Sequence, residues 1–304
     1  MASAIETHGL TKTYGTTRAV VDLDLTIDTG QVFGFLGPNG AGKTTTIRML
    51  LALQQPTNGR ADVLGLDAQR DSVEIHRRIG YLPGDLALYP HMTGRQHIDW
   101  FLRARGERHR PFAEVLVERF NVVMDRPAKQ LSKGNRQKIG LVLAFMHQPE
   151  LLILDEPTSG LDPLMQNEFE RLAHEVVTEG RTVFLSSHDL DEVQRLADRV
   201  SIIKSGTLIT TDTVASLRQN TPQKVEVEFR EPLNPSIFAT LSGVSVKTAE
   251  GSRMMLEVTG AIGPVLRVIG DHDPIDVICR HADLEELFLD LYGEPAALES
   301  SNAD

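Results

Sequence analysis

Eight consecutive residues near the start of the chain have the types and spacing that bind phosphate. The segment Gly37–Thr44 reads Gly-Pro-Asn-Gly-Ala-Gly-Lys-Thr and follows the apolar stretch Gln31–Leu36. Glycines let the backbone wrap around phosphate oxygens with its amide N–H groups pointing inward, and the following helix adds the positive end of its dipole. Lys43 can then reach the β- and γ-phosphates while the Thr44 hydroxyl ligates Mg²⁺. We therefore predict a nucleotide site.

Two carboxylates end a second apolar run. Asp155 and Glu156 follow Leu151–Leu154, and this placement suits Asp155 to hold Mg²⁺, directly or through water, and Glu156 to take a proton from the attacking water. The alternative is an ordinary acidic cluster at the start of a helix. His188 follows a third such run, Thr182–Ser187. Its imidazole could hydrogen-bond the γ-phosphate, although isolated histidines are more often structural or surface residues.

These runs must be strands for the chemistry to converge. Gln31–Leu36, Leu151–Leu154 and Thr182–Ser187 are continuously apolar, as parallel strands covered on both faces are. The helical stretches between them predict an α/β fold whose ligands bind at the carboxyl ends of the strands. These stretches are Thr44–Leu53, Asn135–His147 and Leu164–Glu179. Earlier, Val21–Asp28 alternates apolar and polar residues, which predicts an antiparallel sheet with one wet face.

Residues 85–148 have helical character, with capping-box spacing at Thr93 and Gln96 before an apolar helix face. This pattern predicts an inserted helical subdomain. Beyond residue 218 the pattern changes again to a small accessory α+β unit, residues 219–304. Its expected strand-like segments are Lys224–Arg230, Met254–Val258 and Val265–Ile269, and its expected helix is Asp283–Tyr292. An acidic tail follows from residue 294.

Charge and hydropathy argue against a nucleic-acid-binding protein and against a membrane-spanning one. The net charge is -11, which gives no basic footprint for a nucleic acid, and none is expected as a partner. No apolar window reaches the roughly 18–20 residues needed to cross a bilayer, and no signal peptide is visible, so we expect a cytoplasmic chain. The single cysteine, Cys279, lies in an apolar stretch and is expected to be a buried structural thiol.

Taken in order, these motifs resemble the ATP-binding-cassette (ABC) family over about residues 5–218, and imply a P-loop ABC ATPase domain at 1–218. The most specific element is Leu131–Asn135, hereafter the signature loop, which reads Leu-Ser-Lys-Gly-Asn and is close to the family's Leu-Ser-Gly-Gly-Gln. The resemblance implies that Tyr14 stacks on adenine and that Ser159–Asp162 forms the D-loop. The alternative for Tyr14 is an aromatic side chain of the core.

The family arrangement implies a head-to-tail dimer, in which Ser132 and Gly134 of one subunit close on ATP held by the other. For these two residues the alternative is a simple helix cap. The expected ligands are ATP and Mg²⁺. The expected catalytic residues are Glu156 and His188, and the expected metal ligands are Thr44 and Asp155. The expected nucleotide-binding residues are Tyr14, Gly37, Pro38, Asn39, Gly40, Ala41, Gly42, Lys43, Thr44, Thr45, Ser132, Gly134 and Asp155.

Two motifs depart from the family pattern. Lys133 and Asn135 replace Gly and Gln in the signature loop, a variant that resembles the daunorubicin-resistance and antibiotic exporter branch. Gly84 stands where a Gln or Glu usually reaches Mg²⁺ and water, so Asp85 either substitutes as a metal-facing carboxylate or is a solvated loop residue.

The function implied by the resemblance is a peripheral ATPase on the inner face of the cell membrane. It would power a separate transmembrane permease that exports a drug, an antibiotic or another amphiphile, together with a second nucleotide-binding subunit. An importer ATPase, or a soluble ABC ATPase acting on nucleic acid or ribosomes, are the alternatives.

Overall fold

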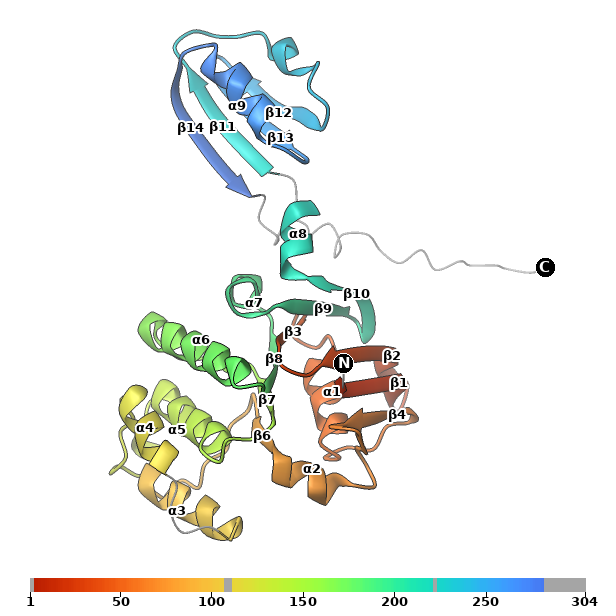
Figure 1. Ribbon diagram of the computed structural model, residues 1–304, viewed down its shortest axis with the longest axis vertical. Helices are drawn as coiled ribbons and strands as arrows, with labels where there is room; N and C mark the ends of the chain where they lie inside the picture. The colour runs from red at the N-terminus through yellow and green to blue at the C-terminus, as the bar shows by residue number, and fades with distance from the viewer. Residues whose placement is uncertain (1–2, 107–110, 221–222, 282–304) are drawn as a thin grey trace, which may run out of the picture. The chain divides into compact units, whose positions relative to one another are not determined.

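A computed structural model describes residues 3–106, 111–220 and 223–281 (Figure 1). The chain divides into two compact units, Met1–Asp212 and Thr213–Asp304. This division lies earlier than the sequence boundary expected after residue 218, and it assigns helix α8 (Val214–Asn220) to the second unit. Each unit has a hydrophobic core of its own.

The first unit begins with an antiparallel sheet. In spatial order its strands are β2 (Thr17–Asp28), β1 (Ser3–Tyr14), β4 (Asn58–Val63) and β5 (Leu66–Asp67). Alternate residues of β2 are buried, including Leu23, Leu25 and Ile27, while their neighbours face outward. The alternation puts one face of the sheet in the core and the other in water, which confirms the antiparallel strand predicted at Val21–Asp28.

A second, six-stranded sheet carries the predicted buried strands. Its spatial order is β10 (Thr207–Thr213), β9 (Arg199–Lys204), β3 (Val32–Leu36), β8 (Thr182–Ser187), β7 (Leu151–Asp155) and β6 (Ile79–Leu82). Strands β3, β7 and β8 are buried along their whole length and pair in parallel, β8 lying between the other two. Parallel pairing brings their carboxyl ends to one edge of the sheet, which confirms the predicted α/β arrangement.

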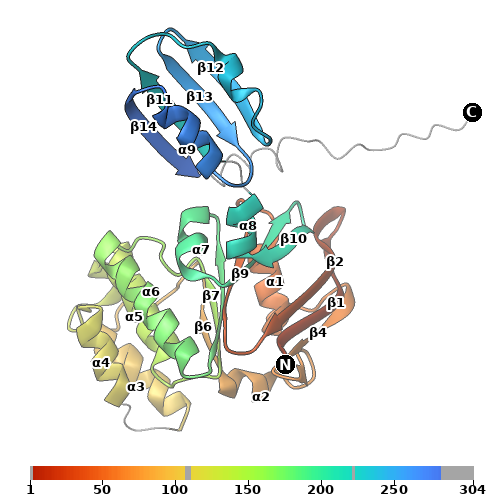
Figure 2. The ribbon, with the colours of Figure 1, turned by 45° about the horizontal axis from the view of Figure 1, so that its top comes forward.

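Helices flank this sheet and fill the insertion. Their bounds are α1 (Lys43–Leu50), α2 (Ser72–Arg78), α3 (Gly94–Ala104), α4 (Pro111–Arg119), the 3₁₀ turn η1 (Ala128–Gln130), α5 (Lys133–Phe145), α6 (Pro163–Thr178) and α7 (Leu190–Leu196). Helices α3, α4 and α5 lie together beside α6 (Figure 2). The capping box predicted at Thr93 and Gln96 is present and begins α3. Within the described residues, every helix is too short or too polar to cross a bilayer.

The second unit contains an antiparallel sheet covered on one face. The sheet order is β12 (Val244–Glu250), β13 (Arg253–Val258), β11 (Gln223–Phe229) and β14 (Pro274–His281), and η2 (Pro235–Phe238) and α9 (Gly263–Gly270) complete the described part. Its core joins alternate residues of β11 and β13 to Phe238 of η2 and to Val265 and Ile269 of α9.

Two expectations for this unit were wrong. Val265–Ile269 lies in helix α9 rather than in a strand, because a five-residue apolar run fits either element and Pro264 favours a helix start. Cys279 is exposed, since its strand β14 lies at the edge of the sheet. The helix expected at Asp283–Tyr292 and the acidic tail lie outside the described residues.

Candidate functional site

Two glycines of the loop between β3 and α1 lie where no other residue would fit without movement. Gly42 has a φ of 110°, and a Cβ there would lie 2.5 Å from the Ala19 carbonyl oxygen. A Cβ on Gly37 would lie 2.4 Å from the carbonyl oxygen of Ile203. Both values are far below a van der Waals contact, so the backbone can follow this path only where side chains are absent.

Lys43 opens helix α1 beneath this loop. Its side chain is only 6% exposed, and its Nζ donates to the carbonyl oxygens of Gly37 (2.5 Å) and Pro38 (3.2 Å). Nζ also lies 3.5 Å from Oε1 of Glu156. Burial lowers the pKa of Lys43, while the carboxylates of Glu156 and Asp155 oppose that shift. The loop thus holds a cation where a phosphate would bind, and that cation is already in contact with the Glu156 carboxylate.

Asp155 ends β7 next to the second residue of α1. Its side chain is 1% exposed, and its Oδ2 accepts a hydrogen bond of 2.8 Å from the Thr44 hydroxyl. The hydroxyl of Ser186, at the end of β8, donates to Oδ1. Because the Thr44 hydroxyl gives its proton to Asp155, its oxygen lone pairs remain available to a cation. A hydroxyl beside a carboxylate fits Mg²⁺, which takes oxygen ligands and usually keeps several waters.

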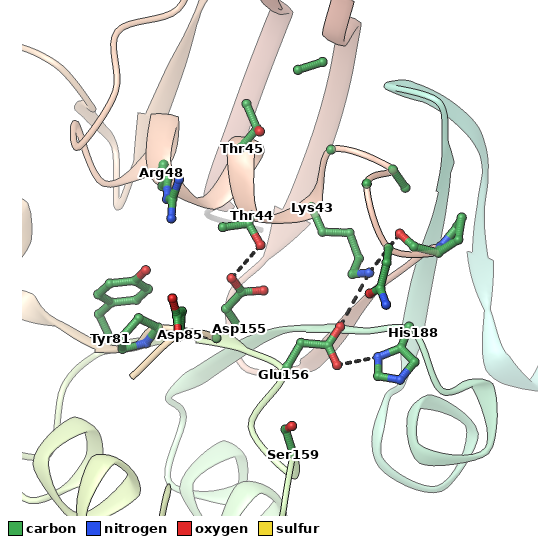
Figure 3. A pocket seen from close by; sticks show the side chains of 18 residues that line it. Lys43, Thr44, Thr45, Arg48, Tyr81, Asp85, Asp155, Glu156, Ser159 and His188 are labelled. Carbon is green, nitrogen blue, oxygen red and sulfur yellow. Dashed lines mark hydrogen bonds and ion pairs between the residues drawn. The ribbon is translucent and has the colours of Figure 1, made fainter. Parts of the chain in front are cut away.

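Glu156 turns its carboxylate toward both Lys43 and His188. Its Oε2 lies 2.5 Å from Nδ1 of His188, which follows β8 and is 55% exposed (Figure 3). Glu156 is the first residue beyond β7 and has a φ of 52°, a left-handed conformation that is unusual for a residue with a side chain. The chain turns sharply here, so the side chains of Glu156 and Asp155 reach different partners.

These residues line one open cavity of about 470 Å³ at the carboxyl edge of the parallel sheet. The predicted residues that line it are Pro38, Asn39, Gly40, Ala41, Gly42, Lys43, Thr44, Thr45, Asp155, Glu156 and His188. Gly37 contributes through its carbonyl oxygen, which binds Lys43. The fold therefore brings together three strand ends that lie far apart in the sequence.

Besides Gly37, three predicted nucleotide-binding residues do not line the cavity. Tyr14, at the end of β1, is 45% exposed; its hydroxyl donates to Gln54, and the Lys12 ammonium lies 5.3 Å from its ring centroid. Ser132 caps helix α5 by accepting a 3.2 Å hydrogen bond from the Asn135 amide. Gly134 packs against Gly160, where a Cβ would lie 2.4 Å from the carbonyl oxygen. The proposed roles of these residues toward ATP stay predictions.

The segment after β6 supplies the opposite wall of the cavity. Asp85 lines it, together with Pro83 and Gly84. A Cβ on Gly84 would lie 3.1 Å from both Cγ and Oδ2 of Asp155, so this glycine lets the loop approach the carboxylate closely. Whether Asp85 replaces the usual Gln stays a prediction.

Sequence patterns had not indicated several lining residues. These are Ala19, Arg48 and Tyr81, and Ser159 was known only as part of the expected D-loop. Burial raises the pKa of Tyr81 to about 12, and the neighbouring Asp155 adds to the shift. Arg48 lies one turn after Thr44 on α1, a helical spacing that would have placed it on the same side.

A buried acidic residue lies in the helix that follows His188. Glu192, in α7, is 4% exposed, and its Oε2 lies 2.5 Å from the Ser187 hydroxyl. Burial raises the pKa of Glu192 to about 7; the carboxylates of Asp189 and Glu156 add to this shift, and hydroxyl hydrogen bonds oppose it. Nothing in the sequence distinguishes this glutamate from a solvated one.

Comparison with known proteins agrees with this geometry. The family model described as "ABC transporter" matches residues 20–159. The daunorubicin resistance ATP-binding protein DrrA3 of Streptomyces coeruleorubidus is 35% identical over 305 residues, which cover 96% of this chain and 96% of that protein. The bacitracin transport ATP-binding protein BcrA of Bacillus licheniformis is 37% identical over 236 residues, covering 76% of each.

Solved structures agree over about 70% of the chain. An ATP-binding subunit of an ABC transporter is 28% identical, with a TM-score of 0.66, and covers 71% of this chain and 92% of its own. The cassette MJ0796, solved as a post-hydrolysis dimer with ADP and Pi, is 21% identical, with a TM-score of 0.63, and covers 69% of this chain and 98% of its own. At this lower identity the likeness concerns the fold.

Proposed function

This chain belongs to the ABC transporter family of ATP-binding, ATP-hydrolysing subunits, and from that premise we propose that it powers export of a drug, an antibiotic or another amphiphile through a separate membrane permease. The similarity to DrrA3 runs through both units of the chain, and BcrA belongs to a bacitracin transporter; these two relatives support the class of cargo. We place the subunit on the inner face of the membrane, as one half of a nucleotide-binding pair.

One observation supports the ATPase mechanism most directly. A buried lysine, a carboxylate in contact with it, and a hydroxyl–carboxylate pair converge on one cavity. In the proposed cycle Lys43 binds the β- and γ-phosphates together with inward-facing amides of the loop. Thr44 and Asp155 would hold Mg²⁺, which when bound neutralises charge on the phosphates.

Glu156 is the proposed general base. Its carboxylate already lies at the phosphate lysine, and a base must lie within hydrogen-bond reach of the water from which it takes a proton. His188 holds the other carboxylate oxygen and stands at the cavity rim, where its imidazole can also bind the γ-phosphate. Ser132 and Gly134 are proposed to close on ATP in the second subunit, so closure would depend on nucleotide and drive the permease.

The Glu156→Gln variant tests the mechanism. We expect it to bind ATP, to lose steady-state turnover and to accumulate an ATP-bound dimer, because the amide keeps the side chain's shape but cannot take a proton. ATP hydrolysis measured by phosphate release, together with light scattering for mass, decides this. Wild-type turnover in the variant would exclude Glu156 as the base.

Coupling to export needs a different measurement. We expect the chain to copurify with a multi-span membrane protein encoded beside its gene, and drugs or amphiphiles to stimulate its ATPase in that complex but not that of the Glu156→Gln complex. A neighbouring substrate-binding lipoprotein, with no stimulation by any amphiphile, would instead indicate import.

A further inference from the structure

The second turn of helix α5 is hydrogen-bonded to the chain just beyond β7. Gln137 is 4% exposed, and its Nε2 donates to two successive carbonyl oxygens, those of Glu156 (3.2 Å) and Pro157 (2.9 Å). A buried amide donor shared between two backbone acceptors fixes the position of both peptide groups. The sequence had not singled out Gln137.

The residue held in this way has a strained backbone. Glu156 has a φ of 52°, and the left-handed conformation is sterically unfavourable for a residue with a side chain. Such a conformation persists only where its surroundings hold it. On one side the Glu156 amide donates to the Ser186 carbonyl oxygen at 3.1 Å, and on the other the Glu156 carbonyl oxygen accepts from Gln137.

Further contacts tie the start of the same helix to the same segment. The Nζ of Lys133 donates to Oγ of Ser159 at 2.8 Å. Gly134 packs against Gly160 so closely that a Cβ would lie 2.4 Å from its carbonyl oxygen. Helix α5 therefore fixes residues 156–160 at several points, and Gln137 is the one that reaches Glu156 itself.

We infer that Gln137 is a positioning residue for ATP hydrolysis, holding Glu156 in the left-handed conformation that aims its carboxylate at Lys43 and His188. This inference rests on the proposed role of Glu156 as the general base. It places the base under the control of α5, the helix that begins at the signature loop. Movement of the signature loop against a second subunit would then reach Glu156 through about one turn of helix.

The variant Gln137→Met tests the inference, since methionine has a similar length and no N–H. The chain offers a matched control: Gln69 also shares its Nε2 between two carbonyl oxygens, those of Met49 (3.0 Å) and Gln54 (3.4 Å), away from the cavity. Gln69→Met removes the same kind of contact. For the full-length variants and wild type we would measure kcat, the KM for ATP, the Kd for ATP without Mg²⁺, and thermal unfolding.

We expect Gln137→Met to lower kcat on the order of 10- to 100-fold, because a misplacement of about 1 Å at a reacting group has effects of this size. Its Kd for ATP should rise by no more than about twofold, since Lys43 and its loop are untouched. Gln69→Met should keep wild-type kcat even if it unfolds at a lower temperature. A wild-type kcat in Gln137→Met, or an equal loss of kcat in both variants, would overturn the inference.

A second background separates positioning from general damage. In Glu156→Gln there is no base to position, so adding Gln137→Met should change residual single-turnover hydrolysis by less than about twofold. A further large loss would show that Gln137 acts on something other than the base. The same series identifies a failure of the proposed function: if Glu156→Gln itself turns over at the wild-type rate, the base assignment fails before Gln137 is considered.

Discussion

Lys43 and Glu156 form an ion pair across the cavity, with Nζ 3.5 Å from Oε1, so the phosphate-binding cation and the proposed base are partners before any nucleotide arrives. Lys43 is buried and Glu156 is one-fifth exposed. An incoming phosphate must compete with the Glu156 carboxylate for the same ammonium. ATP binding therefore has to replace the contact between Lys43 and Glu156.

This competition predicts that Glu156→Gln tightens ATP binding. Removing the negative charge frees Lys43 for the phosphates, and a partly exposed ion pair is worth about 0.5–1 kcal/mol, or roughly two- to fivefold in Kd. Calorimetric titration without Mg²⁺ would measure the effect while hydrolysis is absent. Lys43→Ala provides the opposite control and should abolish binding. Weaker ATP binding in Glu156→Gln would contradict the competition.

Gly84 predicts a steric cost for restoring the family's usual residue. A Cβ at this position would press on Cγ and Oδ2 of Asp155 at 3.1 Å and disturb the hydrogen bond from Thr44. We therefore expect both Gly84→Ala and Gly84→Gln to lower Mg²⁺-dependent hydrolysis, on the order of tenfold, while Mg²⁺-free ATP binding stays close to wild type. A Mg²⁺ titration of ATPase activity tests this. Faster hydrolysis in Gly84→Gln would show that the loop has room for the longer side chain.

Asp85 belongs to the same wall and makes a separate prediction. If it supplies the carboxylate that the loop otherwise lacks, Asp85→Ala should raise the Mg²⁺ concentration needed for half-maximal hydrolysis, and Asp85→Asn should do the same because the amide has no negative charge. Mn²⁺ binding followed by electron paramagnetic resonance in the presence of ATP gives a readout independent of turnover. Unchanged metal affinity in both variants would make Asp85 a solvated loop residue.

The contact between His188 and Glu156 predicts a loss of turnover without a loss of binding. His188→Ala removes the group that lies 2.5 Å from Oε2 of Glu156, and we expect kcat to fall on the order of 10- to 100-fold. His188 is half-exposed at the rim, so ATP affinity without Mg²⁺ should change little. His188→Gln keeps a hydrogen-bond donor and should recover part of the rate. Wild-type kcat in His188→Ala would remove the residue from the mechanism.

The buried Glu192 makes stability depend on pH. Its folded pKa of about 7 lies above the ordinary value of 4.5, so between these values the folded chain keeps a proton that the unfolded chain has released. The contribution of Glu192 to stability therefore falls as pH rises through this window, by at most about 3 kcal/mol. Glu192→Gln should raise the unfolding temperature at pH 8 and lose that advantage near pH 4.5.

Thermal unfolding between pH 4.5 and 8.5 measures the difference, with Glu118→Gln on the exposed side of α4 as the control. A pH-independent difference between Glu192→Gln and wild type would show that the carboxyl is not protonated in the folded chain.

Local sequence was sufficient for the phosphate loop and the buried strands. The run Gln31–Leu36 and the glycines after it could be interpreted from neighbouring residues alone. The glycines allow close backbone approach to phosphate, and the continuous apolar run indicates burial on both sheet faces. Likewise Asp155 could be placed at a strand end from the apolar run before it. The order β3–β8–β7 was not predicted from the sequence, because it is set by the pairing of strands that lie far apart along the chain.

Tertiary contacts decided what the sequence could not. Gln137 and Glu192 are polar residues on amphipathic helices, where a solvated position is the ordinary expectation, and only the packing of α5 and α7 against the sheet edge buries them. Val265–Ile269 is too short for periodicity to separate helix from strand. Tyr14 shows a different limit, because the resemblance assigns it to adenine while its contacts here are with Lys12 and Gln54.

The cap of helix α5 has a consequence for which residues position 132 can accept. Ser132 uses a lone pair of its hydroxyl to receive the Asn135 amide, and its proton remains to be donated. In the proposed dimer that proton faces the neighbour's phosphate. Aspartate would cap the helix as well but would repel the phosphate. Alanine could neither cap the helix nor donate a hydrogen bond to the phosphate. Threonine keeps both functions of the hydroxyl, and asparagine is the other strong capping residue that has an acceptor oxygen together with hydrogen-bond donors, so only a few residue types suit position 132.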